Sequence, residues 1–243
     1  MTAGASALVQ KLNRFLPLQP DELASLAGLE ARRRPITASI EIVHERQVGH
    51  HAFILQEGWA CAYKLLPDGG RQVIDFSVPG DVLGLRSVLL RTSDHGFAAV
   101  TDVVVAEVTA RQMIETFERM PRLAAAILWA ASRDEAMVVE HLVGVGRRDA
   151  EARTAHFLLE LGARLSLVGM ASKAGFDCPL TQYHLADVLG LSAVHVNRVL
   201  RQLREDGLVT FRDGLVTFHD HDRLVELAEF DLAYLDQAGP LLR

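Results

Sequence analysis

Residues 180–218 read LTQYHLADVLGLSAVHVNRVLRQLREDGLVTFRDGLVTF, and this stretch decides the fold of the second half of the chain. Thr181 is a typical N-cap for a first helix, and Gly190-Leu191-Ser192 is a tight turn that ends it. A second helix follows Ser192, and its apolar face consists of Val196, Val199, Leu200 and Leu203. Two helices joined by a short turn that contains glycine predict a helix-turn-helix.

The residues after the second helix predict a β-hairpin. Leu208–Phe211 and Leu215–Phe218 are short apolar runs, and Arg212-Asp213-Gly214 lies between them. Asp-Gly is a preferred sequence for tight hairpin turns. A helix-turn-helix followed at once by a hairpin is a winged module, which is a more specific signal than two helices alone.

The spacing of the second helix leaves a set of side chains facing outward: Ala193, Val194, His195, Asn197, Arg198 and Arg201. Between Ser192 and Arg204 the chain has three arginines and no acid, although its formal net charge is −6. The second helix of such a pair can enter the major groove of DNA. The local charge therefore favours nucleic-acid contact confined to one surface, and the alternative is a solvated helix face.

Toward the N-terminus the pattern changes to short strands, from Ile36 to about Thr109. Apolar runs such as Ala60–Leu66 and Val73–Phe76 are separated by turns, and Pro67-Asp68-Gly69-Gly70 is a strong hairpin signal. Many short strands at this spacing predict a sandwich or jelly roll. Two short helices, over Ala7–Leu16 and Asp21–Leu29, come before the strands and are expected to cover them.

A long helix is predicted from Pro121 to about Val145. One stripe of it steps by three and four residues: Leu128, Ala131, Glu135, Val138, Leu142 and Val145. This stripe favours pairing with a second copy of the helix, and the alternative is packing on its own sheet. Gly144 and Gly146 are expected to interrupt the helix before the next one, over Asp149–Leu165, and to mark the hinge between domains.

The predicted fold class is therefore α+β, with an N-terminal jelly-roll domain, a long dimerisation helix and a C-terminal winged helix-turn-helix domain. We place the first domain at residues 1–120, the long helix and hinge at 121–147, and the second domain with a C-terminal helix at 148–243. No run approaches the roughly 18 apolar residues of a membrane span. Met1–Gln10 lacks the basic front of a secretory signal, so we expect a cytoplasmic protein with no membrane partner.

Other chemistry has weaker support. Cys61 and Cys178 are too isolated for a disulfide framework or a metal site. His50-His51 and Glu57 suggest the alternative function class, a ligand-binding or metal-dependent jelly-roll enzyme whose C-terminal module makes only protein contacts; adjacent strand residues point to opposite faces, however. His219-Asp220-His221-Asp222 is better explained as the cap of a helix over Arg223–Leu235. We expect no enzymatic activity, no catalytic residue, no metal and no cofactor.

Several motifs carry a resemblance to a known family. In the strand region these are Asp68-Gly69-Gly70-Arg71, Phe76 and Pro79-Gly80-Asp81-Val82-Leu83-Gly84; after the hinge they are Arg153, Ala155, Leu158, Leu189-Gly190-Leu191-Ser192 and Val196-Asn197-Arg198. On these motifs, residues 10–220 resemble the CRP/FNR family of bacterial transcription regulators. The resemblance implies a β-roll of the cyclic-nucleotide-binding type and a homodimer paired through the long helix. It also implies binding to a two-fold symmetric operator in double-stranded DNA, and transcription control through contact with RNA polymerase.

The resemblance also assigns roles on the second helix of the winged module. The family's base-reading positions fall on Val194, Asn197 and Arg198. Arg198 suits a forked contact with guanine or phosphate, Asn197 an adenine edge, and Val194 only an apolar contact such as a thymine methyl. The remaining expected DNA contacts, mostly with phosphate, are Thr181, Gln182, Ser192, His195, Arg201 and Arg204.

The candidate effector pocket departs from the nucleotide-binding branch of that family. There, a Glu after the glycine of the Pro-Gly-Asp cassette holds the ribose, and a later Arg-Ser pair holds the cyclic phosphate. This chain has Leu85 after Gly84 and His95-Gly96 in place of the pair, while Arg91-Thr92 comes too early. The positions that hold the adenine align with Val138 and Val139, so the candidate pocket is Leu83, Gly84, Leu85, Arg86, His95, Val138 and Val139.

We therefore expect no response to cyclic AMP. The N-terminal cysteine cluster of the oxygen-sensing branch is also absent from the sequence, so we expect no iron–sulfur control. An apolar ligand, a protein partner and regulation by abundance remain open.

Overall fold

The structure is a computed structural model of the 243-residue chain, and it describes residues 4–48, 51–88, 90 and 92–235. The chain divides into two compact units, an N-terminal unit that ends at Asp134 and a C-terminal unit over Glu135–Leu235. His50, Arg91 and the outer limits of the two predicted domains lie outside the described residues.

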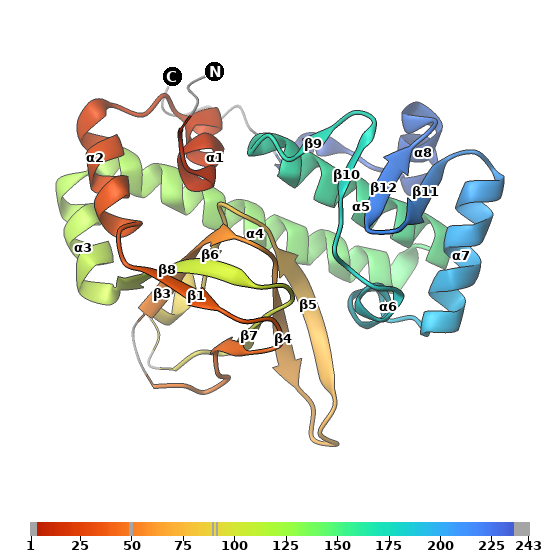
Figure 1. Ribbon diagram of the computed structural model, residues 1–243, viewed down its shortest axis with the longest axis horizontal. Helices are drawn as coiled ribbons and strands as arrows, with labels where there is room; N and C mark the ends of the chain where they lie inside the picture. The colour runs from red at the N-terminus through yellow and green to blue at the C-terminus, as the bar shows by residue number, and fades with distance from the viewer. Residues whose placement is uncertain (1–3, 49–50, 89, 91, 236–243) are drawn as a thin grey trace. The chain divides into compact units, whose positions relative to one another are not determined.

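The N-terminal unit contains the predicted β-roll, built from two four-stranded antiparallel sheets (Figure 1). One sheet has the order β1 (Arg33–Ile36), β8 (Val103–Thr109), β3 (His51–Glu57) and β6 (Val82–Leu83). The other has the order β2 (Glu41–Val43), β7 (Gly96–Ala99), β4 (Ala60–Leu65) and β5 (Arg71–Ser77). Their inner faces share one apolar core, which includes Phe53, Leu55, Leu83, Phe97 and Val105.

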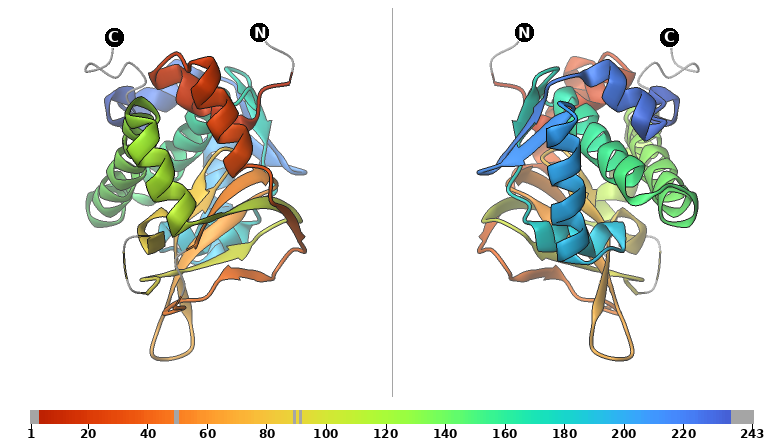
Figure 2. Two further views of the ribbon diagram at one scale, coloured as in Figure 1. Left: turned by 90° about the vertical axis from the view of Figure 1, so that its left-hand side faces the viewer. Right: turned by 90° about the vertical axis from the view of Figure 1, so that its right-hand side faces the viewer.

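The turn at residues 66–70 forms as the sequence predicts. The Gly70 amide donates to the Asp68 carboxylate at 2.9 Å, and the Leu66 amide donates to the Gly70 carbonyl at 2.8 Å. The β4–β5 hairpin extends well beyond the rest of the roll in every view (Figure 2). A short 3₁₀ turn, η1 (Leu85–Val88), follows β6.

Three short helices and the first part of a long one cover one side of the roll: α1 (Ala7–Phe15), α2 (Pro20–Leu29), α3 (Ala110–Arg119) and α4 (Pro121–Arg147). Their apolar faces meet Ala52, Ile54, Ala106 and Val108 of the sheet in a second core. Within it, Lys11 of α1 forms a buried ion pair with Asp81 at 2.7 Å. The two N-terminal helices thus cover the strands, as expected from their sequence.

The long helix does not stop at its glycines. It continues through Gly144 and Gly146 and ends at Arg147, so the break between helices falls at Arg148 and Asp149. A helical glycine costs about 1 kcal/mol relative to alanine. Side-chain donors offset that cost here, because Arg148 bonds the Glu140 carbonyl at 3.3 Å and Arg153 bonds the Val145 carbonyl at 3.4 Å.

The C-terminal unit is organised around α5 (Ala150–Leu167), which Asp149 caps. Around it lie β9 (Ala171–Ser172), β10 (Gly175–Asp177), α6 (Gln182–Leu189), α7 (Ala193–Glu205), β11 (Val209–Arg212), β12 (Leu215–Phe218) and α8 (His221–Ala228). The strands form one sheet of order β11-β12-β10-β9. None of the described helices is both long enough and apolar enough to cross a membrane.

The predicted last helix, Arg223–Leu235, is wrong at both ends. Asp220 caps it by accepting from the Arg223 amide, as expected, but the helix begins at His221 and ends at Ala228. Glu229 then adopts a left-handed conformation, and a separate 3₁₀ turn, η2 (Leu232–Leu235), follows. The break brings the rings of Phe230 and Tyr234 against buried His156, a contact that periodicity does not reveal.

Candidate nucleic-acid interface

The two helices of the turn motif are fixed by the caps that the sequence predicts. The Thr181 hydroxyl accepts from the His184 amide at 3.3 Å, and the Ser192 hydroxyl accepts from the His195 amide at 3.2 Å. Gly190 ends α6 in a left-handed conformation. Because both hydroxyl oxygens act as acceptors in these bonds, each O–H proton remains available to a phosphate oxygen.

Helix α7 buries one face and exposes the other. Val196, Val199, Leu200 and Leu203 are buried, as expected. The outward face presents Asn197, Arg198, Arg201, Arg204 and Val194, whose side chain is 82% exposed. An apolar side chain so fully exposed at the start of a helix is available for contact with a partner.

The polar side chains of this face differ in their partners. Arg201 pairs with Glu205 one turn later at 3.3 Å, an exposed contact that holds little energy. Asn197 donates to the Gln182 side-chain oxygen at 3.1 Å. Within the described part of the chain, the guanidinium groups of Arg198 and Arg204 have no hydrogen-bonding or charged partner. Their donors therefore face solvent.

The wing lies directly after α7. Strands β11 and β12 form the predicted hairpin, with Phe211 opposite Val216, although Arg212 belongs to β11 rather than to the turn and pairs with Leu215. Asp213 and Gly214 both have positive φ, as a two-residue hairpin turn of this type requires. The winged module is thus built as expected.

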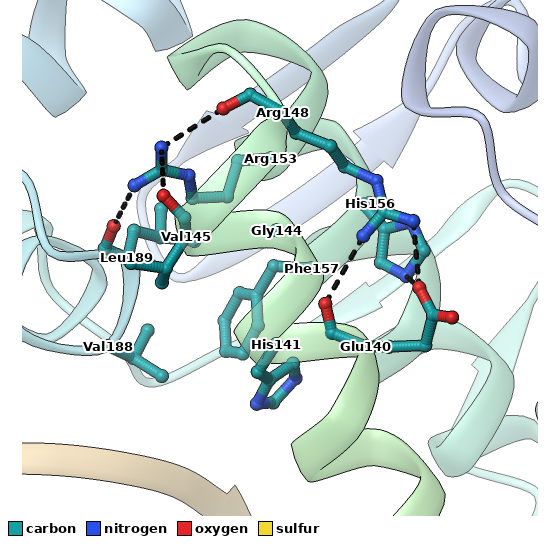
Figure 3. A pocket seen from close by; sticks show the side chains of 10 residues that line it. All are labelled: Glu140, His141, Gly144, Val145, Arg148, Arg153, His156, Phe157, Val188 and Leu189. Carbon is teal, nitrogen blue, oxygen red and sulfur yellow. Dashed lines mark hydrogen bonds and ion pairs between the residues drawn. The ribbon is translucent and has the colours of Figure 1, made fainter.

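Arg153 fixes α6 to the hinge, a role that sequence reasoning missed although the residue carried the resemblance. Its guanidinium donates to the Leu189 carbonyl at 2.7 Å and to the Arg148 carbonyl at 3.0 Å (Figure 3). One arginine therefore satisfies carbonyl groups at the ends of two helices. It ties the C-terminal end of α6 to the start of α5.

Sequence reasoning also missed a buried polar network in the same unit. Glu160 of α5 is fully buried and accepts from the Tyr234 hydroxyl at 2.8 Å, while its other oxygen lies 2.9 Å from His141 and 3.9 Å from Arg164. His156 lies 3.2 Å from the same hydroxyl. Because these partners come from separate segments of the chain, no local pattern in the sequence reveals them.

Burial and neighbouring charges both shift the pKa values of the titratable groups in this network. Burial alone raises the pKa of Glu160, but the charge and hydrogen bond of His141, with Arg164 and Tyr234, outweigh it and hold the pKa below its ordinary value. Burial, reinforced by the nearby charge of Arg148, lowers the pKa of His156. Glu160 is thus an ionised carboxylate inside the fold, and His156 is neutral near pH 7.

A small cavity lies beside the network (Figure 3). It is lined by residues of α4, α5 and α6, which include Glu140, Gly144 and Phe157, and by Arg148 between α4 and α5. Its volume is about 20 Å³. One or two water molecules need that much space, whereas organic ligands occupy pockets of about 300–1,000 Å³. This cavity therefore suits hydration of the buried polar groups.

The candidate effector residues of the roll are partly engaged with one another. Leu83 is buried in the roll core and Leu85 is half-buried beyond Gly84. Arg86 and His95 both contact the Asp94 carboxylate, at 3.1 Å and 2.8 Å. A β-carbon at Gly96 would lie 2.5 Å from the Tyr63 ring, so a serine there would displace the tyrosine.

The predicted dimerisation stripe is exposed in the single chain. Leu128 is 68% exposed and Leu142 is 73% exposed, and Val138 and Val145 are also exposed. Ala131 is half-buried, and the carboxylate of Glu135 faces solvent. The opposite face of the first part of α4 packs in the N-terminal core through Leu123, Ala126, Ile127 and Ala130. Val139, which aligns with an adenine-binding position, is likewise exposed.

The remaining candidates have separate partners. His51 contacts Glu107 at 2.8 Å, and Glu57 pairs with Arg33, so the two do not form a common site. Cys61 and Cys178 are both buried, and burial raises the pKa of the Cys178 thiol to about 12. Such a thiol is unreactive at neutral pH.

The fold and the interface define a class of protein, namely transcription regulators with an N-terminal roll of the cyclic-nucleotide-binding type and a C-terminal winged reader. Residues 33–120 match the family model of the cyclic nucleotide-binding domain, and residues 152–227 match that of the Crp-like helix-turn-helix domain. The chain belongs to the CRP/FNR family of transcription regulators.

Individual relatives agree with this assignment. The chain is 30% identical to the nitrogen fixation regulation protein FixK of Bradyrhizobium diazoefficiens over 199 residues, 81% of this chain and 82% of that protein. It is 30% identical over 186 residues, 76% of each chain, to the transcriptional activatory protein AadR of Rhodopseudomonas palustris. The structure of FixK2 from Bradyrhizobium japonicum matches with a TM-score of 0.72 at 26% identity, covering 80% of this chain and 96% of that one. These relatives are regulators and not enzymes.

Proposed function

We propose that this protein is a homodimeric transcription regulator that binds a two-fold symmetric DNA operator in a sequence-specific manner. The observation that carries the proposal is the outward face of α7, where Val194, Asn197 and Arg198 are exposed side by side on a capped, well-packed helix. A helix in this position of a winged module enters the major groove. A protein that reads chromosomal DNA in a bacterium works in the cytoplasm, so we place it there.

Each exposed side chain has a distinct role in this proposal. Arg198 makes a bidentate hydrogen bond to a guanine edge, Asn197 bonds an adenine edge, and Val194 contacts a thymine methyl group. Phosphate oxygens on either side are met by Thr181, Gln182, Ser192, His195, Arg201 and Arg204. The exposed stripe of α4 pairs with its copy in a second chain, so two readers meet two half-sites. By analogy with the family, the bound dimer then contacts RNA polymerase.

Random-sequence selection at moderate salt tests the proposal directly. We expect the protein to enrich a two-fold symmetric sequence. Arg198→Ala should weaken binding to that sequence by about 1–3 kcal/mol and relax the preference at one position per half-site. Arg201→Ala and Arg204→Ala are matched changes on the same helix. They should instead weaken binding to all DNA sequences alike and reduce the salt dependence of the affinity.

Failure to enrich any sequence would refute the proposal and favour the ligand-binding or enzymatic alternative. If all three arginine variants lost the same affinity for every DNA sequence, the proposal of DNA binding would stand. The division of roles among the three arginines would be wrong.

The proposed regulator does not respond to cyclic AMP or cyclic GMP. A cyclic phosphate in the roll would lack its arginine fork, since Arg86 and His95 both contact Asp94, and Gly96 has no room for a hydroxyl side chain. Charge-assisted bonds to phosphate are roughly twice as strong as neutral ones. A ribose facing Leu85 would also leave its hydroxyls unpaired, at about 1–3 kcal/mol.

Titration calorimetry with each nucleotide checks this prediction, and no heat of binding is expected up to millimolar nucleotide. Micromolar binding, or a gain in operator affinity with either nucleotide, would contradict it. Iron–sulfur control is likewise not part of the proposal, because Cys61 and Cys178 are buried in different units.

A further inference from the structure

The side chains of Gln182 and Asn197 meet across the helix-turn-helix. Gln182 is the first residue of α6, Asn197 lies in the second turn of α7, and both are exposed. The Asn197 amide nitrogen donates to the Gln182 side-chain oxygen at 3.1 Å. This bond joins a side chain that we assign to base reading to one that we assign to the DNA backbone.

The bond leaves Asn197 with unused hydrogen-bonding groups of a defined kind. An asparagine amide has two N–H donors and one acceptor oxygen. With one N–H directed to Gln182, its oxygen and its second N–H remain, and that pair of groups matches the N6 amino group and N7 of adenine. If the amide turned over, it would present its amino group alone to acceptors such as O6 and N7 of guanine.

We propose that Gln182 is a specificity-determining residue, which positions the Asn197 amide so that it reads adenine rather than guanine. This inference rests on the proposed DNA-binding function. In water an exposed amide pair contributes little, but a hydrogen bond strengthens when DNA excludes the surrounding water. When the Gln182 amino group bonds a phosphate oxygen, the Gln182 side-chain oxygen is the group left facing Asn197, and this fixes the orientation of the Asn197 amide when the base is read. Gln182 keeps both of its own N–H donors for a phosphate.

Variants of Gln182 separate positioning from simple contact. Glutamate can only accept hydrogen bonds, so Gln182→Glu should keep the orientation of the Asn197 amide and the preference for adenine. Repulsion between the carboxylate and phosphate should weaken binding to all DNA sequences. Lysine can only donate, so Gln182→Lys should turn the amide over and shift the preference toward guanine. Methionine has a similar length and forms neither bond, so Gln182→Met should lose the preference. All three changes are at an exposed position.

The measurement is random-sequence selection followed by affinities for the four bases at the position that Asn197→Ala identifies. For the unaltered protein we expect the affinity with adenine at this position to exceed the affinity with the next best base at least about fivefold. For Gln182→Met we expect the same ratio to be less than about twofold. Gln202→Met is the matched control, because Gln202 is exposed on α7 and bonds Asp206 instead. It should leave the preference unchanged.

The outcomes are distinguishable. If the unaltered protein selects no sequence, the proposed function fails and this inference fails with it. If it selects a sequence and Gln182→Met keeps the full preference, only the positioning role is wrong. An adenine preference that survives in Gln182→Lys but is lost in Gln182→Glu would overturn the assigned orientation.

Discussion

Replacing Leu142 with aspartate should make the protein monomeric and reduce its affinity for a two-fold operator on the order of 100-fold or more. Leu142 is 73% exposed in the single chain, in line with Val138 and Val145 on the stripe of α4. Burying a leucine side chain in a helix pair contributes about 1.5–3 kcal/mol, and the symmetric pair buries two copies. A carboxylate there would remain without a partner in an apolar contact.

Light scattering and operator titration of the same samples check this prediction. Val143→Asp is the matched control, because Val143 is the next residue on α4, also exposed, and turned away from the stripe. It should stay dimeric and bind DNA. A Leu142→Asp protein that remains a dimer with full operator affinity would show that α4 is not the pairing surface.

Removing the buried carboxylate of Glu160 should destabilise the C-terminal unit by about 3–5 kcal/mol. Glu160→Ala removes the acceptor of the buried Tyr234 hydroxyl and the carboxylate that lies 3.9 Å from Arg164. Hydrogen exchange of the α5 amides in the full chain measures the opening free energy of this unit. Glu226→Ala, at an exposed position on α8, should change it by less than about 0.5 kcal/mol.

The same pair of proteins should respond differently to pH. The folded-state pKa of Glu160 is lower than its ordinary value of 4.5, so its contribution to stability is full above pH 4.5 and is lost as the pH falls through the folded-state pKa. The difference between the unaltered protein and Glu160→Ala should therefore shrink as the pH falls below 4.5. A difference that grows on acidification would show that Glu160 is protonated in the folded protein.

Local sequence patterns predicted the covering helices, the roll, the long helix and the winged module in their correct order, but not α3 or the short strands β9 and β10. Local signals were sufficient for the winged module, because its caps at Thr181 and Ser192 and its Asp213-Gly214 turn each act within a few residues. The hairpin turn at Asp68 and the strands of the roll were predictable from the sequence because their signals also act within a few residues. The exposure of Val194, Asn197, Arg198 and Arg201 follows from helical periodicity alone. Ala193 and His195, which were also expected to face outward, are half-buried.

Tertiary structure decided the features that depend on partners distant in the chain. The glycines at 144 and 146 stay helical because Arg148 and Arg153 satisfy nearby carbonyl groups, and the last helix breaks after Ala228 because Phe230 and Tyr234 pack on His156. The buried carboxylate of Glu160 and the bond between Gln182 and Asn197 have the same origin. A side chain's hydrogen-bonding partner depends on the folded distance between segments, whereas periodicity and capping record only what neighbouring residues prefer.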